Sequence, residues 1–523
     1  MRTLLKGILV AAAFVAGTVV AAEAFERRGD DVFLVVAGRQ AVPNMDPSLK
    51  YDASRRTFFQ AMYDALFKYE GTPPEAKPWL AESYSVSDDG LTYTFNLAKD
   101  AKFHNGDPVT AEAVRWSFER TLKLGQGPSW SLAPVLKPEN IKVVDDHTVE
   151  MTLERPFSPF LSFLPWWYVL NPAEVMANEV DGDYGQAYLV DNSAGGGPYK
   201  IARVEPNNLY ELERYDDYWK GHEGDLSGII YKVVREGSVQ RAGLQKGEFD
   251  IVLDLSPDEF QVASRTRGVE TSTEPALTSF GIKFNTQAEF TDDVNIRKAI
   301  AHAFDYDALV KIFNGRAQLQ TSPFTDNIRG HVEVDGIPRQ DLAKAKEFLA
   351  QSSHPDGGFE LEFVYVQGFE AQRQMGLVLI DSLKDLGIDV KMVPLTWANM
   401  VERMGSEETA PQMICIFTTP ISNDPDAVAI QYHPISHGQY YGSHYLDDPD
   451  LNAMIEEARA AIDWDEREPI YAQIQEKIVE LQPEMFGMMR ERLVAYRDYV
   501  QGFEYTPVRM TSEIDMYGLH IGQ

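Results

Sequence analysis

The chain has 523 residues, of which 44% are hydrophobic, and a formal net charge of −32 at pH 7. This length is enough for two or three packed lobes. The acidic excess argues against nucleic acid and anionic membrane surfaces as partners, because both need clustered lysine and arginine. The single cysteine, Cys415, excludes an internal disulfide, and its apolar surroundings predict a small buried side chain.

The N-terminus has the pattern of a secretory signal peptide. Arg2 and Lys6 precede an apolar run over residues 7–20, and Ala22-Glu23-Ala24 forms a small-x-small cleavage site. The run is shorter than the roughly 20 residues that span a bilayer. We expect residues 1–24 to be removed on export, with no cysteine after the run to carry a lipid anchor.

The next elements predict the start of a first lobe and a hairpin-rich block. A short strand over 32–37 ends in Gly38-Arg39, and a loop at 43–47 leads into a helix around 54–67. Hydrophobic residues then alternate along a strand after the Asp88-Asp89-Gly90 turn, at Leu91, Tyr93, Phe95 and Leu97. Thr110 precedes a helix over 111–121, which matches the preference for threonine at helix N-caps.

Further strands at 141–144 and 149–153 complete a mostly antiparallel block from about 70 to 190. It also contains the aromatic run 164–168. We expect one of Trp166 and Trp167 to be a core residue and the other to be partly exposed.

A different pattern begins near residue 276. Phe280, Ile282 and Phe284 alternate in a strand, and a helix is predicted over 294–304. A strand at 359–365, a helix at 371–386 stopped by Gly387 and a strand at 388–392 predict a parallel βαβ unit. Two helices are expected over 451–462 and 467–481, and strands from 488 to 508 return to the first lobe.

Several separated passages together resemble one known family. The stretch PWLAESYSVSDDGLTYTFNLAKDAKFHNGDPVTAEAVRWSFER at 78–120 carries the strongest likeness. Asp46-Pro47, the GGGPYK element at 195–200, and Asn285 followed by Arg297, Ala299 and Ile300 agree in order with the same family. The chain therefore resembles the family 5 solute-binding proteins, the peptide- and nickel-type extracytoplasmic receptors of ABC importers.

The resemblance implies a mixed α/β fold of the type II periplasmic binding protein kind, with two lobes about a two-segment hinge and an extra hairpin-rich subdomain, as in cluster C. We name the expected parts lobe I (25–70, 191–277 and 489–523), the accessory subdomain (71–190) and lobe II (278–488). The hinge crossings are expected near 276–282 and 485–492.

The implied function is that of a periplasmic receptor without catalytic activity, cofactor or metal. It would capture one organic solute between the lobes by hinge closure and deliver it to the permease of an ABC importer. An oligopeptide or peptide-like ligand is the family's default, and we expect a monomer.

Candidate ligand contacts are polar or aromatic side chains in regions that the resemblance places at the cleft. They are Arg39, Asn44, Trp166, Trp167, Trp397, Thr418, Thr419, Ser422, Asp424, Tyr440 and Tyr441.

Two departures from the family disfavour a free dipeptide. Ile421 occupies the position where peptide-binding relatives carry an acidic residue for the ligand's ammonium group. The loop at 366–368 lacks the arginine that holds a dipeptide's carboxylate, and the nearby Arg373 falls in a helix. An unpaired ligand charge in a closed cleft costs several kcal/mol. A neutral oligosaccharide or a sugar conjugate such as an opine is the main alternative.

A nickel-chelate receptor, a chaperone and a hydrolase have weaker support from the sequence. His433, His437 and His444 could hold a nickel chelate, although surface or core roles are commoner for histidines in such loops. A periplasmic chaperone or chemoreceptor partner on the same fold also stays open. A secreted hydrolase is disfavoured because the chain has no Gly-x-Ser-x-Gly, no His-Glu-x-x-His and no cysteine pair. The acidic pairs at 88–89, 145–146, 292–293 and 447–448 are interpreted as turns and caps.

Overall fold

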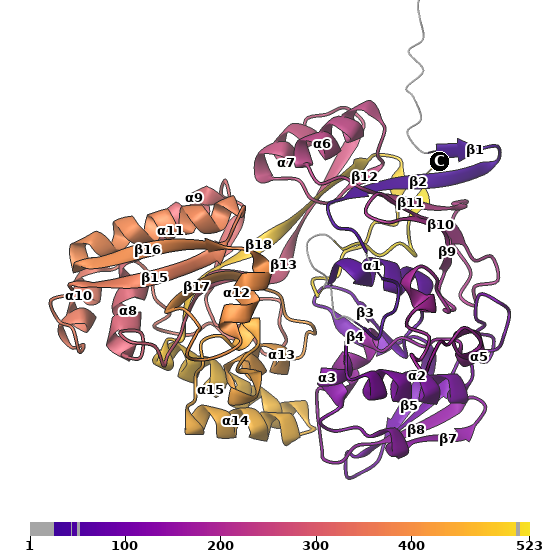
Figure 1. The fold of residues 1–523 in the computed structure, drawn as a ribbon, viewed down its shortest axis with the longest axis horizontal. Coiled ribbons are helices and arrows are strands. Elements are labelled where there is room, and N and C mark those ends of the chain that lie inside the picture. Colours follow the sequence, from indigo (N-terminus) through magenta and orange to yellow (C-terminus); the bar gives the residue numbers. More distant parts are fainter. Residues whose placement is uncertain (1–25, 43, 50–52, 509–512, 523) are drawn as a thin grey trace, which may run out of the picture.

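Residues 26–42, 44–49, 53–508 and 513–522 are described by a computed structural model. Two groups of elements lie side by side, and the long strands β13 (Val269–Phe284) and β18 (Glu484–Arg497) run together from one group to the other (Figure 1). The predicted signal peptide, residues 1–24, lies outside the described part. No helix within that part has both the length and the apolar character to cross a membrane.

A single large sheet connects the two groups. Its strand order is β16-β15-β17-β13-β18-β12-β2-β11-β10-β9, with β1 beside β2 and β14 beside β18. The strands on the lobe I side are β1 (Glu26–Arg28), β2 (Asp31–Gly38), β9 (Tyr199–Glu205), β10 (Leu209–Arg214), β11 (Gly228–Val233) and β12 (Ile251–Val252). β2 is parallel to both β11 and β12, and it is buried from Phe33 to Gly38. Such an apolar run is typical of a parallel strand covered on both faces.

The predicted hinge crossings fall within the pairing of β13 with β18. The register runs from Val269 opposite Arg497 to Lys283 opposite Glu484, with shifts before Ser279 and before Ile282. Lys283 and Glu484 form a buried ion pair of 2.7 Å. A charge pair at this depth costs desolvation and is kept only with good geometry. The ion pair therefore joins the two crossing strands at positions that lie opposite each other.

The accessory subdomain is a four-stranded antiparallel sheet, order β5-β6-β8-β7, with α2 packed against it. Thr110 caps α2 by accepting the Ala113 N–H at 3.3 Å, and Gly125 ends the helix with a positive φ of 62°. The antiparallel strands predicted for this part of the chain are thus present over residues 81–152. β3 (Phe67–Glu70) lies at the end of the first part of lobe I and pairs with β4 (Glu75–Pro78). The other elements of the accessory subdomain are β5 (Ala81–Val86), β6 (Thr92–Leu97), α2 (Ala111–Leu124), α3 (Ser129–Leu132), β7 (Ile141–Asp145), β8 (Thr148–Thr152), α4 (Phe160–Phe163) and α5 (Pro172–Ala177).

The predicted βαβ unit lies at the lobe II edge of the large sheet. β15 (Phe359–Val366) is parallel to β16 (Ile388–Leu395), and α11 (Glu370–Leu383) connects them. The last predicted turn of that helix is a 3-10 turn over Lys384–Leu386, and Gly387 stops it with a φ of 66°. The remaining elements are α8 (Val294–Ala303), α9 (Tyr306–Ile312), β14 (Ala317–Leu319), α10 (Leu342–Ala350), α12 (Trp397–Met404), β17 (Met413–Thr418), α13 (Asp426–Ala429), α14 (Pro449–Ala460) and α15 (Trp464–Leu481).

Some predicted boundaries were wrong. The helix expected around 54–67 is α1 (Ala53–Met62), because Phe67 instead begins β3, which pairs with β4. α15 starts three residues before the predicted Arg467, since Asp463 caps it by accepting the Asp465 N–H. Lobe I also contains α6 (Gly237–Lys246), α7 (Pro257–Ala263), β19 (Val500–Gln501) and β20 (His520–Ile521).

The acidic pairs have the structural roles that the sequence indicated. Asp293 and Asp448 are N-caps of α8 and α14. Asp89 accepts the Leu91 N–H inside the hairpin turn, and Asp145 accepts the His147 N–H. These carboxylates therefore satisfy backbone donors at turns and helix ends.

Candidate functional site

The lobe I part of the candidate site lies at the carboxyl ends of parallel strands. Arg39 follows β2 and Asp254 follows β12, and the Arg39 backbone N–H donates to Asp254 Oδ2 at 2.7 Å. The Arg39 side chain is exposed. In open α/β sheets, ligands bind in the crevice outside the carboxyl ends of the strands. Arg39 is thus placed where a ligand contact is expected for this fold class.

The corresponding edge of lobe II carries several predicted contacts. Thr418 ends β17, and the Thr419 hydroxyl lies 2.8 Å from the Thr278 hydroxyl of β13. Trp397 is the first residue of α12, directly after β16, and 46% of it is exposed. Its ring lies edge-on to Tyr440, with centroids 5.4 Å apart. Trp397 therefore offers a free aromatic face beside neutral hydroxyl groups.

Tyr440 and Tyr441 extend this aromatic surface. Their rings meet edge to face with centroids 5.2 Å apart, and both side chains are half-buried. Burial raises the pKa of Tyr440, and it raises the pKa of Tyr441 to about 12. Both hydroxyls are thus neutral at physiological pH and can donate hydrogen bonds.

Asn44 and the Asp46-Pro47 turn are held internally. Asn44 Oδ1 accepts the Asp46 N–H at 2.7 Å. The Asp46 carboxylate accepts from both terminal nitrogens of Arg120 on α2, at 2.9 and 2.5 Å, and both side chains are fully buried. The loop after β2 is therefore tied to the accessory subdomain, and Asn44 has only part of its amide left for a ligand.

The tryptophan pair differs from the expectation. Trp167 is 1% exposed and donates its indole N–H to Ser131 Oγ at 3.1 Å, so it belongs to the core of the accessory subdomain. Trp166 is also buried, at 7%, so the prediction that one of the pair is partly exposed was wrong. Trp166 instead joins the two groups of elements, because its indole N–H donates to Ile421 O at 2.8 Å. We leave Trp167 out of the proposed contacts.

Ser422 and Asp424 are engaged in the loop that follows β17. Ser422 is fully buried, and its hydroxyl accepts the Asp424 N–H at 3.3 Å. Asp424 pairs with Arg467 of α15 at 2.7 Å, and the side chains are 9% and 5% exposed. The guanidinium group of Arg467 at this distance occupies the Asp424 carboxylate, which is then not available to a ligand. We therefore also leave both residues out of the proposed contacts.

The missing anchors have structural explanations. Ile421 packs against the core of the accessory subdomain, where a carboxylate would be desolvated without a partner. Arg373 lies on the surface of α11 and pairs with Glu370 of the same helix at 2.7 Å.

The three histidines do not converge. His444 is buried with its ring stacked on Tyr432, centroids 4.9 Å apart. His437 Nε2 lies 3.0 Å from Leu446 O, and His433 Nε2 lies 3.6 Å from a carboxylate oxygen of Glu456. Among the described residues, no three histidine, cysteine, aspartate or glutamate side chains form a group that could hold a metal ion.

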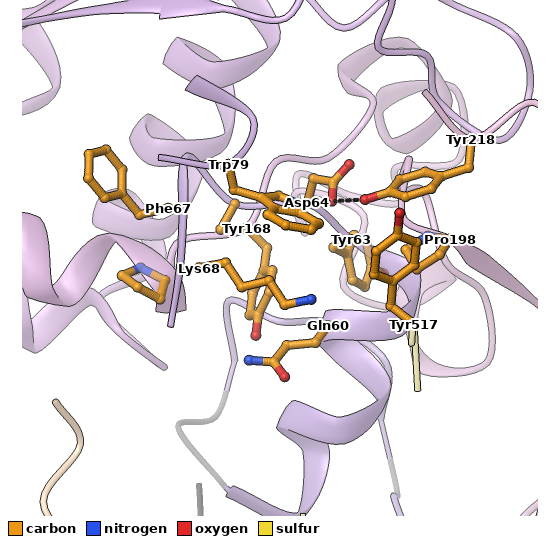
Figure 2. A pocket seen from close by; sticks show the side chains of 12 residues that line it. Gln60, Tyr63, Asp64, Phe67, Lys68, Trp79, Tyr168, Pro198, Tyr218 and Tyr517 are labelled. Atoms are coloured by element: carbon orange, nitrogen blue, oxygen red, sulfur yellow. Dashed lines mark hydrogen bonds between the residues drawn. The ribbon is translucent and has the colours of Figure 1, made fainter. Parts of the chain in front are cut away.

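Another pocket is lined by residues of lobe I and of the accessory subdomain (Figure 2). Its lining includes Gln60, Asp64, Lys68 and Tyr517. Asp64 accepts hydrogen bonds from Trp79 Nε1 at 2.9 Å, Tyr218 OH at 3.0 Å and Trp219 Nε1 at 2.9 Å. Burial raises the pKa of Asp64, and these donors oppose the rise. Because three side chains of the protein already donate to it, Asp64 connects lobe I with Trp79 of the accessory subdomain and is not a free ligand anchor.

The sequence patterns did not indicate one charged residue that lies between the lobes. Arg490 is on the crossing strand β18, and its guanidinium carbon lies 4.8 Å from the centroid of Phe417 in β17. Burial lowers the pKa of Arg490, and the nearby Asp254 of lobe I opposes this effect. The only local signal was an arginine within the apolar strand sequence EMFGMMRERLV. Its position between the lobes depends on strand pairing far along the chain.

Comparison with known proteins identifies the family. Residues 75–439 match the family described as bacterial extracellular solute-binding proteins, family 5. The chain belongs to this family. It is 27% identical over 491 residues to the "Probable D,D-dipeptide-binding periplasmic protein DdpA" of Escherichia coli K12, covering 91% of this chain and 92% of that protein.

Solved structures of family 5-type receptors confirm the fold. The periplasmic binding protein DppA of Helicobacter pylori, in complex with the peptide STSA, has a TM-score of 0.81 and 24% identity, covering 94% of this chain and 98% of that one. AgaA of A. tumefaciens R10, in complex with agropinic acid, has a TM-score of 0.78 and 24% identity, covering 94% and 99%. The expected mixed α/β architecture of type II periplasmic binding proteins is therefore confirmed.

Proposed function

We propose that this family 5 protein is the periplasmic receptor of an ABC importer and binds one organic solute between lobe I and lobe II. The observation that carries the proposal is the meeting of two sheet edges. The carboxyl ends of β2 and β12 and those of β16 and β17 belong to different lobes, and β13 and β18 connect these lobes. This is the arrangement in which closure about a hinge encloses a ligand.

An oligopeptide or peptide-like solute is the first candidate. Support comes from the relatives named for dipeptides and peptides. The exposed Trp397 and the hydroxyls of Thr419, Tyr440 and Tyr441 suit a ligand that is held by stacking and by its backbone polar groups. The proposed contact set is completed by Arg39, Asn44, Trp166 and Thr418.

A sugar conjugate or neutral oligosaccharide is the second candidate. It is favoured by Ile421, which supplies only a backbone carbonyl where an ammonium anchor is expected, and by the similarity to AgaA, whose structure contains agropinic acid. In either case the protein acts by binding and release, as a monomer, and the closed form is presented to the permease. The segment boundaries given above for lobe I, the accessory subdomain and lobe II are part of this proposal.

A thermal-shift screen followed by calorimetric titration tests the proposal. The mature chain is screened against alanine peptides of two to five residues, agropinic acid and maltotriose. At a free ligand concentration 100 times Kd, a single site stabilises the folded state by about 2.7 kcal/mol. We expect one of these classes to stabilise the protein with 1:1 stoichiometry. Absence of any shift and of any binding heat across all three classes would contradict the proposed ligands.

A further inference from the structure

Arg490 is positioned between elements of both lobes. It lies on β18 opposite Ala317 of β14, and its guanidinium group faces Phe417 of lobe II. Phe417 is in turn stacked on Phe280, with centroids 4.3 Å apart. From the lobe I side, the opposing charge that acts on Arg490 is that of Asp254, which follows β12. The guanidinium therefore lies where the two sheet edges approach each other.

Arg490 is also unusual in its lack of partners. In the described part of the chain it makes no hydrogen bond and no ion pair through its side chain, although it is half-buried. Other buried arginines are satisfied directly: Arg120 by Asp46 and Arg467 by Asp424. A partly desolvated cation without a hydrogen-bonded counter-charge is costly unless another group supplies one.

The charges around Arg490 favour an anion. Asp254 is the carboxylate that acts on Arg490, and it is shared with Arg39 and Arg492. One Asp254 oxygen is already occupied by the Arg39 backbone N–H. A single carboxylate thus faces three guanidinium groups, although the formal net charge of the protein is −32. Positive charge focused between low-dielectric walls raises the local concentration of anionic ligands.

We propose that Arg490 binds a carboxylate group of the solute. This inference rests on the proposed receptor function and narrows its ligand to an organic acid, such as a peptide with a free C-terminus or an acidic sugar conjugate. A guanidinium group matches a carboxylate with two parallel N–H···O bonds. Phe417 and the 49% exposed Phe369, with ring centroids 6.4 Å apart, provide an apolar wall next to this anchor. The anchor thus replaces the arginine that is missing from the 366–368 loop.

The test compares acids with their amides on wild type and Arg490→Met. The probes are alanine peptides of two to five residues with a free C-terminus, the same peptides with a C-terminal amide, agropinic acid and maltotriose. We expect the wild type to bind an acid at least about tenfold more tightly than its amide, as a charge-assisted bidentate contact provides. Arg490→Met keeps an unbranched apolar side chain against Phe417. This variant should bind the acid at least about tenfold more weakly than the wild type does. Its affinity for the amide should change by no more than about twofold.

Two further variants control for charge and folding. Arg373→Met removes the same charge from the surface of α11, where Arg373 is already paired with Glu370, and should leave acid binding unchanged. Arg490→Lys keeps the charge without the fork geometry, so it should retain part of the preference for acids. Unfolding temperatures of the ligand-free variants are measured alongside, so that loss of binding is separated from loss of structure.

The possible results distinguish a failure of the carboxylate anchor at Arg490 from a failure of the proposed receptor function. If acid and amide bind equally, if Arg490→Met does not change acid binding, or if maltotriose alone binds, the carboxylate anchor is overturned while the receptor function stands. If no probe binds to the wild type, both the proposed ligand classes and the anchor are overturned.

Discussion

Asp46 illustrates how this protein uses buried charge. Both of its carboxylate oxygens accept from Arg120, and neither side chain reaches solvent. Removal of one partner from a buried pair leaves an uncompensated charge. Asp46→Asn should therefore lower the free energy of unfolding by about 3–5 kcal/mol, measured by urea denaturation. Asp89→Asn, in an exposed turn, is the matched control, and we expect a loss of less than about 1 kcal/mol. Equal losses in the two variants would contradict a role for Asp46 in tying the subdomains together.

Trp397 is the residue at which ligand binding and stability should separate. Nearly half of it is exposed, so Trp397→Ala should change the unfolding free energy little while weakening a bound solute by at least about 1 kcal/mol through lost stacking. Trp130 on α3 is 43% exposed and provides the matched control outside the proposed contacts. The two variants are compared by calorimetric titration with a ligand from the screen. If the two substitutions weaken binding equally, or if neither weakens it, Trp397 does not belong to the site.

At the scale of elements, the loop between β6 and α2 contains a pH-dependent contact. His104 Nε2 lies 3.0 Å from Gly197 O, its ring is packed against Tyr215, and Nδ1 is buried without a partner in the described structure. Burial lowers the pKa of His104 from 6.5 to about 4. Between these values the unfolded chain binds a proton that the folded chain does not, so the contribution of His104 to stability falls as the pH falls.

His104→Gln tests this linkage, because a glutamine amide can still donate to Gly197 O and does not titrate. The unfolding free energies of wild type and variant are measured at pH 7 and pH 5. The wild type should lose more stability than the variant on acidification. If both lose the same amount, His104 is not kept neutral by its surroundings.

The helices and strands were easier to predict than the residues and strands that lie next to them in space. The βαβ unit and α2 could be predicted because helical periodicity, Thr110 and the stop at Gly387 are local signals. The end of α1 could not, because Phe67 belongs to β3 only through its pairing with β4. The candidate site residues divide in the same way, into those with a local sequence signal and those whose surroundings come from distant parts of the chain. Trp397 and Thr419 follow strands and stay in the proposed site, whereas Trp167 makes a core contact with Ser131. Arg490 was missed since its surroundings come from β12, β14 and β17 together.

At the scale of the whole molecule, the two groups of elements already touch. Trp166 donates to Ile421 O, Asn423 donates to Pro74 O at 2.6 Å, and the Ser158 N–H donates to Arg459 O. These contacts end on backbone carbonyls, so they depend on the relative position of the lobes more than on the acceptor's side chain. A ligand between the lobes should favour the state that makes them, because it binds that state more tightly.

The most direct measurement is the distance between spin labels on the two lobes. Val144→Cys in the accessory subdomain and Asp381→Cys on α11 place labels at exposed positions, with side chains that make few contacts. Cys415 can stay, because it is fully buried and burial raises the pKa of its thiol. Saturation with a ligand that binds 1:1 should shorten the mean distance and remove its longer component, while non-binding probes change nothing. A distance distribution that stays the same when such a ligand is bound would contradict capture by closure of the lobes.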